Sequence, residues 1–257
     1  MVTRTAYSAV IGLALLLQGC AGVIPAQAAP VAADVEAPRA AGSFEVKKGR
    51  PGVVIGAPHG TSDSATDLIG RELARLTGFG LVVATGFSRL DPDGRRFNIN
   101  RPTESIPGSP ARLEEQTAEA RRLYEAYRRR VVEAAQGPLR LYIEVHGNGH
   151  EESSGRVEIA TVGLSRDEAW RLKTLFELIR DARLQDLEAP RLQVWLESLD
   201  PLRYTASAAK QSGILSASGR ALHIELPRIA RTSYREVYTG LLGDFLTQSA
   251  SFLVPRD

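Results

Sequence analysis

Residues 52–60 read GVVIGAPHG, a run of small and β-branched apolar residues closed by a proline, a histidine and a glycine. Such a run predicts a strand that is buried on both faces and ends at His59. Residues 141–146 and 222–225 repeat the pattern and end on a histidine and a glutamate. Buried strands deliver their last side chains to one edge of a sheet, so these remote residues can meet there.

Predicted strands alternate with predicted helices along the rest of the domain. Strands are expected at residues 81–85, 139–145, 156–162, 192–196 and 221–226, and helices at residues 64–76, 111–135, 165–182 and 233–252. Residues 90–110 are polar and rich in proline and glycine, which predicts a long functional loop. This alternation implies an α/β three-layer sandwich, in which helices cover both faces of a mostly parallel or mixed sheet.

The composition is that of an ordinary folded protein. The chain has 257 residues, 43% hydrophobic and 24% charged, which suits one α/β domain once the first segment is set aside. A formal net charge of +2 gives no reason to expect a nucleic acid partner. The sequence contains no glycine-rich phosphate motif and no G-x-S-x-G elbow. With only four histidines, a serine triad has few candidates.

Residues 1–20 predict a lipoprotein signal peptide. Arg4 precedes an apolar run at residues 9–17 that is too short to span a bilayer but suits a secretory signal. Cys20, the only cysteine, follows Leu-Gln-Gly and resembles the acylated cysteine of a bacterial lipobox. The alternative is a signal that is cleaved after the Ala-Gln-Ala of residues 26–28.

Two segments follow this signal. Residues 21–43 are rich in Ala, Val and Pro without periodicity, which predicts a flexible tether. Residues 44–257 form the predicted catalytic domain. Acylation would make the lipid bilayer a partner and would place the domain on the periplasmic, extracytoplasmic side of a bacterial membrane. The oligomeric state stays open.

His59 and Asp63 are the first candidate metal ligands. They lie on a short connection that contains Gly60, so an imidazole and a carboxylate can bend toward one ion. Asp67 is the alternative carboxylate, and a role for Asp63 as a helix N-cap is the alternative to metal binding. His146 is the second histidine candidate.

Two predicted strands each carry a pair of polar residues. Glu144 and His146 alternate along one strand and therefore point to the same face. His223 and Glu225 repeat this arrangement on the other strand. Glu225 is the candidate general base, because a carboxylate beside a metal can take a proton from an attacking water. Glu144 is a further ligand or a hydrogen-bond acceptor, and His223 is structural, a ligand or a proton relay.

Arg101 is the candidate for binding the substrate. Its planar guanidinium can hold a substrate carboxylate or a developing oxyanion, with Asn100 beside it. The alternative is an arginine in a surface ion pair. Asn148 is a further candidate contact with the substrate, whereas His150 is expected to be exposed to solvent.

Four short motifs resemble, in their order, those of the N-formylglutamate amidohydrolase family. They are Ala57-Pro58-His59-Gly60, Asn100-Arg101-Pro102, Glu144-Val145-His146 and Ile224-Glu225-Leu226. The resemblance covers most of residues 50–230 and implies a phosphorylase/hydrolase-like fold of the zinc carboxypeptidase-like hydrolases.

The resemblance also implies roles for single residues. His59 and His146 would bind zinc together with an acidic residue soon after His59. Arg101 would bind a substrate carboxylate or polarise the scissile carbonyl, and Glu225 would activate water. The chain departs from the usual pattern because Asp63 lies four residues after His59, rather than three, and because a glutamate replaces the aspartate of the family's D-x-H. The export signal favours an extracytoplasmic amide or peptide as substrate over formylglutamate.

We therefore expect a lipid-anchored, zinc-dependent enzyme that hydrolyses an amide or peptide bond in a small substrate. The expected Zn²⁺ ligands are His59, Asp63 and His146, and the expected catalytic residues are Glu225 and Arg101. One rival is a metal- or ligand-binding lipoprotein that has the same fold without turnover. The other is a metal-free hydrolase that uses Glu144 and Glu225 as acid and base.

Overall fold

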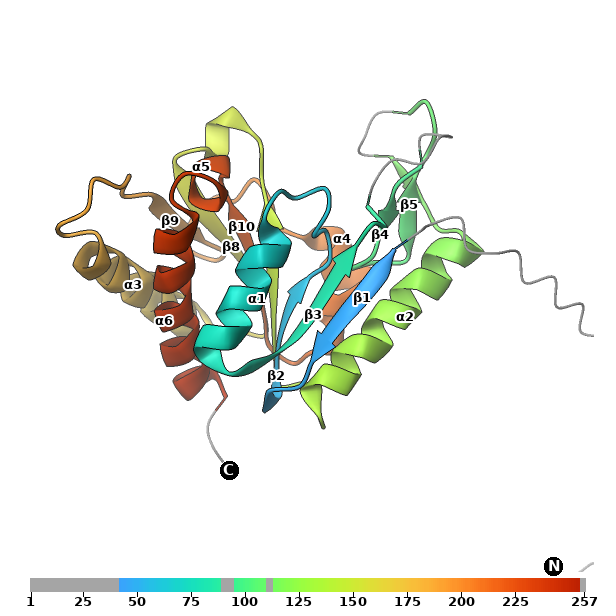
Figure 1. Ribbon diagram of the computed structural model, residues 1–257, viewed down its shortest axis with the longest axis horizontal. Helices are drawn as coiled ribbons and strands as arrows, with labels where there is room; N and C mark the ends of the chain where they lie inside the picture. Colours follow the sequence, from blue (N-terminus) through green and yellow to red (C-terminus); the bar gives the residue numbers. More distant parts are fainter. Residues whose placement is uncertain (1–41, 89–94, 110–112, 255–257) are drawn as a thin grey trace, which may run out of the picture. The chain divides into compact units, whose positions relative to one another are not determined.

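The computed structural model describes residues 42–88, 95–109 and 113–254 (Figure 1). The predicted signal peptide, the predicted lipidation of Cys20 and nearly all of the predicted tether lie outside the described residues. Within the described ranges, no helix combines the length and the hydrophobicity that crossing a membrane requires.

A mixed sheet of seven strands forms the centre of the domain, in the order β1-β3-β2-β7-β10-β8-β9. The strands are β1 (Ser43–Lys47), β2 (Arg50–Ala57), β3 (Phe79–Thr85), β7 (Leu141–Gly147), β8 (Arg156–Val162), β9 (Gln193–Leu196) and β10 (Ala221–Leu226). Strands β3, β2, β7 and β10 run parallel to one another. Strands β1 and β8 pair antiparallel on either side of this group, and β9 runs parallel to β8.

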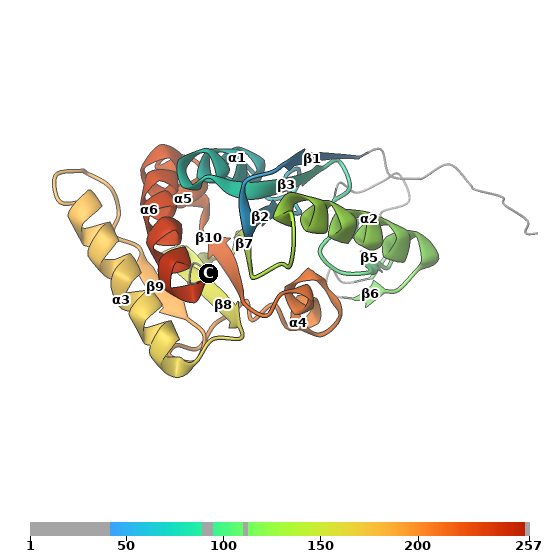
Figure 2. The same cartoon turned by 90° about the horizontal axis from the view of Figure 1, so that it is seen from below.

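Helices cover both faces of the sheet (Figure 2). One face carries α1 (Thr66–Thr77), α3 (Arg166–Arg183) and α6 (Arg235–Leu253), with the short α5 (Arg228–Arg231) before α6, and the other carries α2 (Ala118–Ala135) and α4 (Ser207–Ser212). Val54 and Ile55 are neighbours on β2, yet they belong to separate hydrophobic clusters. Successive side chains of a strand point to opposite faces, so two cores form. The predicted three-layer α/β sandwich is therefore confirmed.

Local signals explain several boundaries. Helix α3 starts at a capping box, in which Ser165 accepts a hydrogen bond from the backbone of Glu168 and the Glu168 side chain bonds back. Helix α1 ends at Gly78, whose φ of 72° is accessible to glycine at little cost.

Two predictions about the polar region were wrong. Residues 90–110 do not form one loop, because β4 (Phe97–Asn98) and β5 (Thr103–Ser105) lie within them. The helix predicted from residue 111 begins only at Ala118. The residues before it contribute β6 (Glu114–Glu115), which pairs with β5 to complete a small antiparallel sheet.

The register of β7 and β10 positions the polar residues that the sequence singled out. His146 lies opposite Glu225, and Glu144 lies opposite His223. Paired residues of adjacent parallel strands point to the same face, so all four side chains gather on one side of the sheet.

Candidate metal centre

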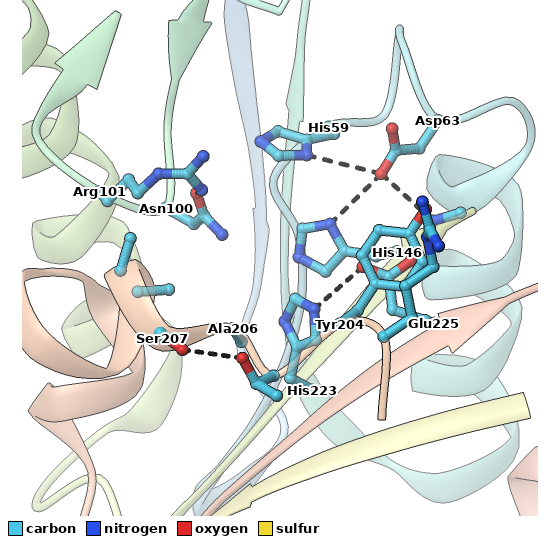
Figure 3. A pocket seen from close by; sticks show the side chains of 15 residues that line it. His59, Asp63, Asn100, Arg101, His146, Tyr204, Ala206, Ser207, His223 and Glu225 are labelled. Atoms are coloured by element: carbon cyan, nitrogen blue, oxygen red, sulfur yellow. Dashed lines mark hydrogen bonds and ion pairs between the residues drawn. The ribbon is translucent and has the colours of Figure 1, made fainter. Parts of the chain in front are cut away.

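The carboxyl ends of β2, β7 and β10 open into a pocket of about 420 Å³ (Figure 3). The site residues on its wall that the sequence identified are His59, Asp63, Asn100, Arg101, His146, His223 and Glu225. The segment from Arg203 to Ala209 supplies further lining side chains, including Tyr204. Sequence reasoning missed this segment, because it shows neither strand nor helix periodicity and its contact with the pocket depends on the fold.

Asp63 lies between two imidazoles (Figure 3). Its Oδ2 is 3.5 Å from Nδ1 of His59 and 3.2 Å from Nδ1 of His146. One ligand atom from each of these three residues lies within 4.8 Å of the other two. Tetrahedral zinc holds nitrogen and oxygen ligands at about 2.0–2.2 Å, which places neighbouring ligand atoms about 3.3 Å apart. The spacing around Asp63 therefore fits a zinc-sized ion.

The loop after β2 directs Asp63 toward His146. The Asp63 amide donates to the His59 carbonyl at 2.9 Å, which closes a turn. The Asp63 side chain accepts a hydrogen bond from the Gly147 amide at 3.2 Å. Ala65, rather than Asp63, occupies the N-cap of α1, so the alternative role of Asp63 as a cap is wrong. Asp67 binds Arg71 at 2.7 Å and does not line the described part of the pocket.

Glu144 lies deeper than this group and is fully buried. It accepts hydrogen bonds from Tyr142 Oη at 3.1 Å and Asn100 Nδ2 at 3.3 Å, and its Oε2 is 3.0 Å from His223 Nδ1. The same oxygen lies 3.0 Å from His146 Nε2 without an aligned hydrogen bond. These donors satisfy Glu144, so it acts as an acceptor behind the two histidines, although Glu144, His146 and His223 also have metal-binding spacing.

Charges around the histidines set their protonation. Burial lowers the pKa of His59, so its imidazole is neutral at neutral pH and can offer a lone pair to a metal. Burial opposes protonation of His146 as well, but the charge of Glu144 and the hydrogen bond with Asp63 outweigh it and raise the pKa of His146 to about 10. Without a metal, the protonated imidazole of His146 thus lies between the carboxylates of Asp63 and Glu144.

The same contacts keep both carboxylates ionised. Burial alone would raise the pKa of Asp63, but hydrogen bonds with His146 and His59 hold it far below its usual range. Burial would also raise the pKa of Glu144, but the charge and close contact of His146 and the hydrogen bond with His223 lower it. A metal can displace the proton of His146, and the imidazole of His59 is already neutral. Together with the negative carboxylates, these imidazoles attract a divalent cation.

Polar atoms at the pocket are left without partners. Nε2 of His59 and Oε2 of Glu225 are buried and have no hydrogen-bond partner among the described residues. The other carboxylate oxygen of Glu225 lies 3.1 Å from Nε2 of His223. Buried polar groups are normally paired, so unpaired atoms in a polar pocket fit a site that receives a metal and a ligand.

Arg101 lines the pocket but is already paired. Its guanidinium binds the carboxylate of Glu114 through two nitrogens, with Nε at 2.9 Å, and its Nη1 donates to Asn100 Oδ1 at 3.2 Å. Thr103 donates to the same carboxylate of Glu114 at 2.8 Å. The ion pair that was the alternative is therefore present, with Glu114 as a partner that the sequence did not indicate, and the contact of Arg101 with a substrate stays a prediction.

Asn148, the further predicted contact with the substrate, lies outside the pocket lining. It is not among the described residues that line the pocket, and its side-chain oxygen accepts a hydrogen bond from Ser153 Oγ at 3.1 Å. His150 is exposed, as predicted.

No protein-family model matches the sequence, and no curated protein is significantly similar to it. The fold is similar to that of a bacteriophage poly-gamma-glutamate hydrolase, at 12% identity and a TM-score of 0.45 over 83% of this chain and 89% of the other. A metallo-carboxypeptidase from Burkholderia cenocepacia is 13% identical, with a TM-score of 0.45 over 84% of this chain and 66% of that one. An N-acetylmuramoyl-L-alanine amidase of Nostoc punctiforme is 12% identical, with a TM-score of 0.36 over 82% and 100%. At this level of similarity, the chemistry has to be read from the residues of the chain itself.

Proposed function

We propose that this protein is a metal-dependent hydrolase that cleaves an amide or peptide bond and uses zinc. The observation that supports it best is the position of Asp63 Oδ2, 3.5 Å and 3.2 Å from the Nδ1 atoms of His59 and His146 at an open pocket. His59, Asp63 and His146 would hold the ion and leave one tetrahedral position for the reaction. A bound zinc ion supplies Lewis acidity that polarises a carbonyl and eases loss of a proton from water.

Glu225 is placed to move the proton. Its Oε2 is unpaired among the described residues, while its Oε1 is held by His223, so the carboxylate is oriented with one oxygen free. It takes a proton from the attacking water as the water oxygen bonds to the carbonyl carbon. When the carbon–nitrogen bond breaks, Glu225 returns that proton to the amine that leaves, which balances the reaction.

Arg101 and Asn100 face the ion-binding group from the other side of the pocket (Figure 3). The pairing of Arg101 with Glu114 fixes the plane of the guanidinium and offsets its charge. We assign Arg101 to orienting the substrate carbonyl through its remaining hydrogen-bonding capacity. A substrate carboxylate would have to compete with Glu114, so a neutral amide group is the simpler occupant.

Anchoring by lipid is a separate proposal that rests on residues 1–20. We propose that Cys20 is acylated and holds the enzyme at the periplasmic side of a membrane, where its substrate would be an extracytoplasmic amide or peptide. Mass spectrometry of the N-terminal peptide tests this in the full-length protein. A lipid-modified Cys20 is the expected result, and a chain that begins after residue 28 would contradict it.

The test of the metal-dependent activity measures zinc and hydrolysis on one preparation. We expect about one zinc ion per protein and cleavage of at least one member of a panel of amides and peptides. This cleavage should stop when a chelator removes the zinc and return when zinc is added back. His59→Ala and His146→Ala should lose both, whereas His150→Ala, which changes an exposed histidine outside the pocket, should keep both.

Each rival has its own outcome in this experiment. Zinc without cleavage of any member of the panel would favour a binding lipoprotein. Cleavage that survives strong chelators would favour the metal-free hydrolase, and full zinc occupancy in both alanine variants would reject the assigned ligands. The metal-free mechanism is disfavoured because Glu144, one of its two carboxylates, is buried and already accepts several hydrogen bonds.

A further inference from the structure

Arg231, the last residue of α5, is a buried arginine that the sequence pattern did not single out. Only 6% of it is exposed. Its guanidinium donates to three backbone carbonyls, those of Ser64 at 2.6 Å, Asn148 at 3.0 Å and Leu226 at 3.1 Å. A planar guanidinium holds its donors in a fixed fork, so one rigid group joins three segments of the chain.

Each of the three acceptors adjoins a residue of the candidate metal centre. Ser64 follows Asp63 directly, and Leu226 follows Glu225 directly. Asn148 lies two residues after His146, at the end of β7. Arg231 therefore ties the loop that carries the proposed ligands His59 and Asp63 to the ends of the two strands that carry the third ligand and the base.

Glycine at position 147 permits this contact. A Cβ on Gly147 would overlap with Cζ and Nε of Arg231, so the guanidinium packs directly on the backbone after His146. The amide of Gly147 in turn donates to Asp63 at 3.2 Å. The carboxylates of Asp63 and Glu225 also attract the guanidinium by their charge. The backbone contacts of Arg231 and its charge thus both hold the Asp63 loop and the end of β10 near the guanidinium.

We infer that Arg231 is a positioning residue of the metal centre, which sets the distance between the Asp63 loop and the ends of β7 and β10 before an ion binds. This inference rests on the proposed metal-dependent function. Groups behind metal ligands fix the orientation of those ligands, and their loss typically weakens metal binding about 10- to 100-fold. Lysine cannot replace Arg231, because an ammonium group lacks the planar fork that reaches three separated carbonyls.

The test compares Arg231→Lys with Arg180→Lys in the whole domain. Arg180 is a suitable control because its side chain is only 14% exposed and donates to a backbone carbonyl, that of Leu192 at 2.9 Å, but does not line the pocket. The dissociation constant of Zn²⁺ is measured by competition with a chromogenic chelator, and circular dichroism verifies that each variant is folded. The visible spectrum of the Co²⁺-loaded protein reports ligand geometry independently of activity.

We expect zinc binding to weaken about 10- to 100-fold and the Co²⁺ spectrum to shift in Arg231→Lys alone. Unchanged binding and an unchanged spectrum in folded Arg231→Lys would overturn the inference and leave the proposed function intact. A wild-type domain that binds no zinc would overturn both. If Arg231→Lys does not fold, Gly147→Ala obstructs the same contact without removing the arginine, and an unchanged Co²⁺ spectrum there would overturn the inference.

Discussion

The two halves of the candidate metal centre are held in place by different means. His146 and Glu225 lie on neighbouring strands at paired positions, and their side chains are 5% and 8% exposed. The side chains of His59 and Asp63 lie on a loop and are 13% and 17% exposed. We call these the strand half and the loop half. The ladder of strand hydrogen bonds fixes the first, whereas a few separate contacts fix the second.

The difference indicates what a metal ion would add. The strand half is built into the core, so its geometry exists without an ion. The loop half depends on single bonds, such as that between the Gly86 amide and Thr61 Oγ1 at 2.6 Å and that between the Gly60 amide and the Ala84 carbonyl at 3.0 Å. Metal binding should therefore stabilise the loop half more than the strand half.

The largest expected effect comes from removing one ligand from each half. His146→Ala and Asp63→Ala should each lose zinc and reduce kcat/KM about 1000-fold or more, because the Lewis acid supplies several kcal/mol. His146→Ala should also destabilise the folded protein, by about 2 kcal/mol and by more than Asp63→Ala does, since it removes a partner of fully buried Glu144. Metal analysis and urea unfolding measure both effects. Equal losses of stability would contradict the distinction between the halves.

Glu225→Gln should separate catalysis from metal binding within the strand half. The amide cannot take a proton from water, so kcat should fall about 100- to 10,000-fold. Zinc content should stay at the wild-type level, because Glu225 is not one of the three proposed ligands. Substantial residual turnover at full zinc occupancy would remove Glu225 as the base.

The protonation of His146 predicts how zinc binding depends on pH. Since its pKa is raised from 6.5 to about 10, its proton stabilises the metal-free fold fully below about pH 6.5, and this contribution is lost as pH rises through about 10. Zinc must displace this proton, so binding should release about one proton near pH 7 and strengthen about tenfold per pH unit. Calorimetry in two buffers with different ionisation enthalpies measures the release. Binding without proton release would show that His146 is neutral in the metal-free protein.

The smallest expected effect compares one hydroxyl from each half. Thr61→Val removes the acceptor of the Gly86 amide in the loop half, and Tyr142→Phe removes a donor to Glu144 in the strand half. Each should cost about 1 kcal/mol of unfolding free energy. Only Thr61→Val should also weaken zinc binding, by less than about tenfold, because the loop half is the adjustable one. Weaker zinc binding in Tyr142→Phe alone would reverse the comparison.

Much of the fold was predictable because its signals are local. The predicted strands at residues 156–162 and 221–226 coincide with β8 and β10. The wrong start of α2 shows the limit of such signals. Glu114–Glu115 pairs with β5 instead of joining the helix, and Leu113, which fitted the helical pattern, is 52% exposed. A pairing partner elsewhere in the chain decided that segment.

The sequence by itself determined which residues stand at the strand ends, because alternation and short apolar runs are properties of consecutive residues. Only the tertiary structure decided which of them meet. The opposition of Glu225 to His146, the pairing of Arg101 with Glu114 and the bond of Asn148 with Ser153 follow from strand register and loop paths. Arg231 gives the clearest case, since its bond to Ser64 joins positions 167 residues apart. No local pattern encodes such a contact, because a guanidinium finds its acceptors only after the segments that carry them have packed together.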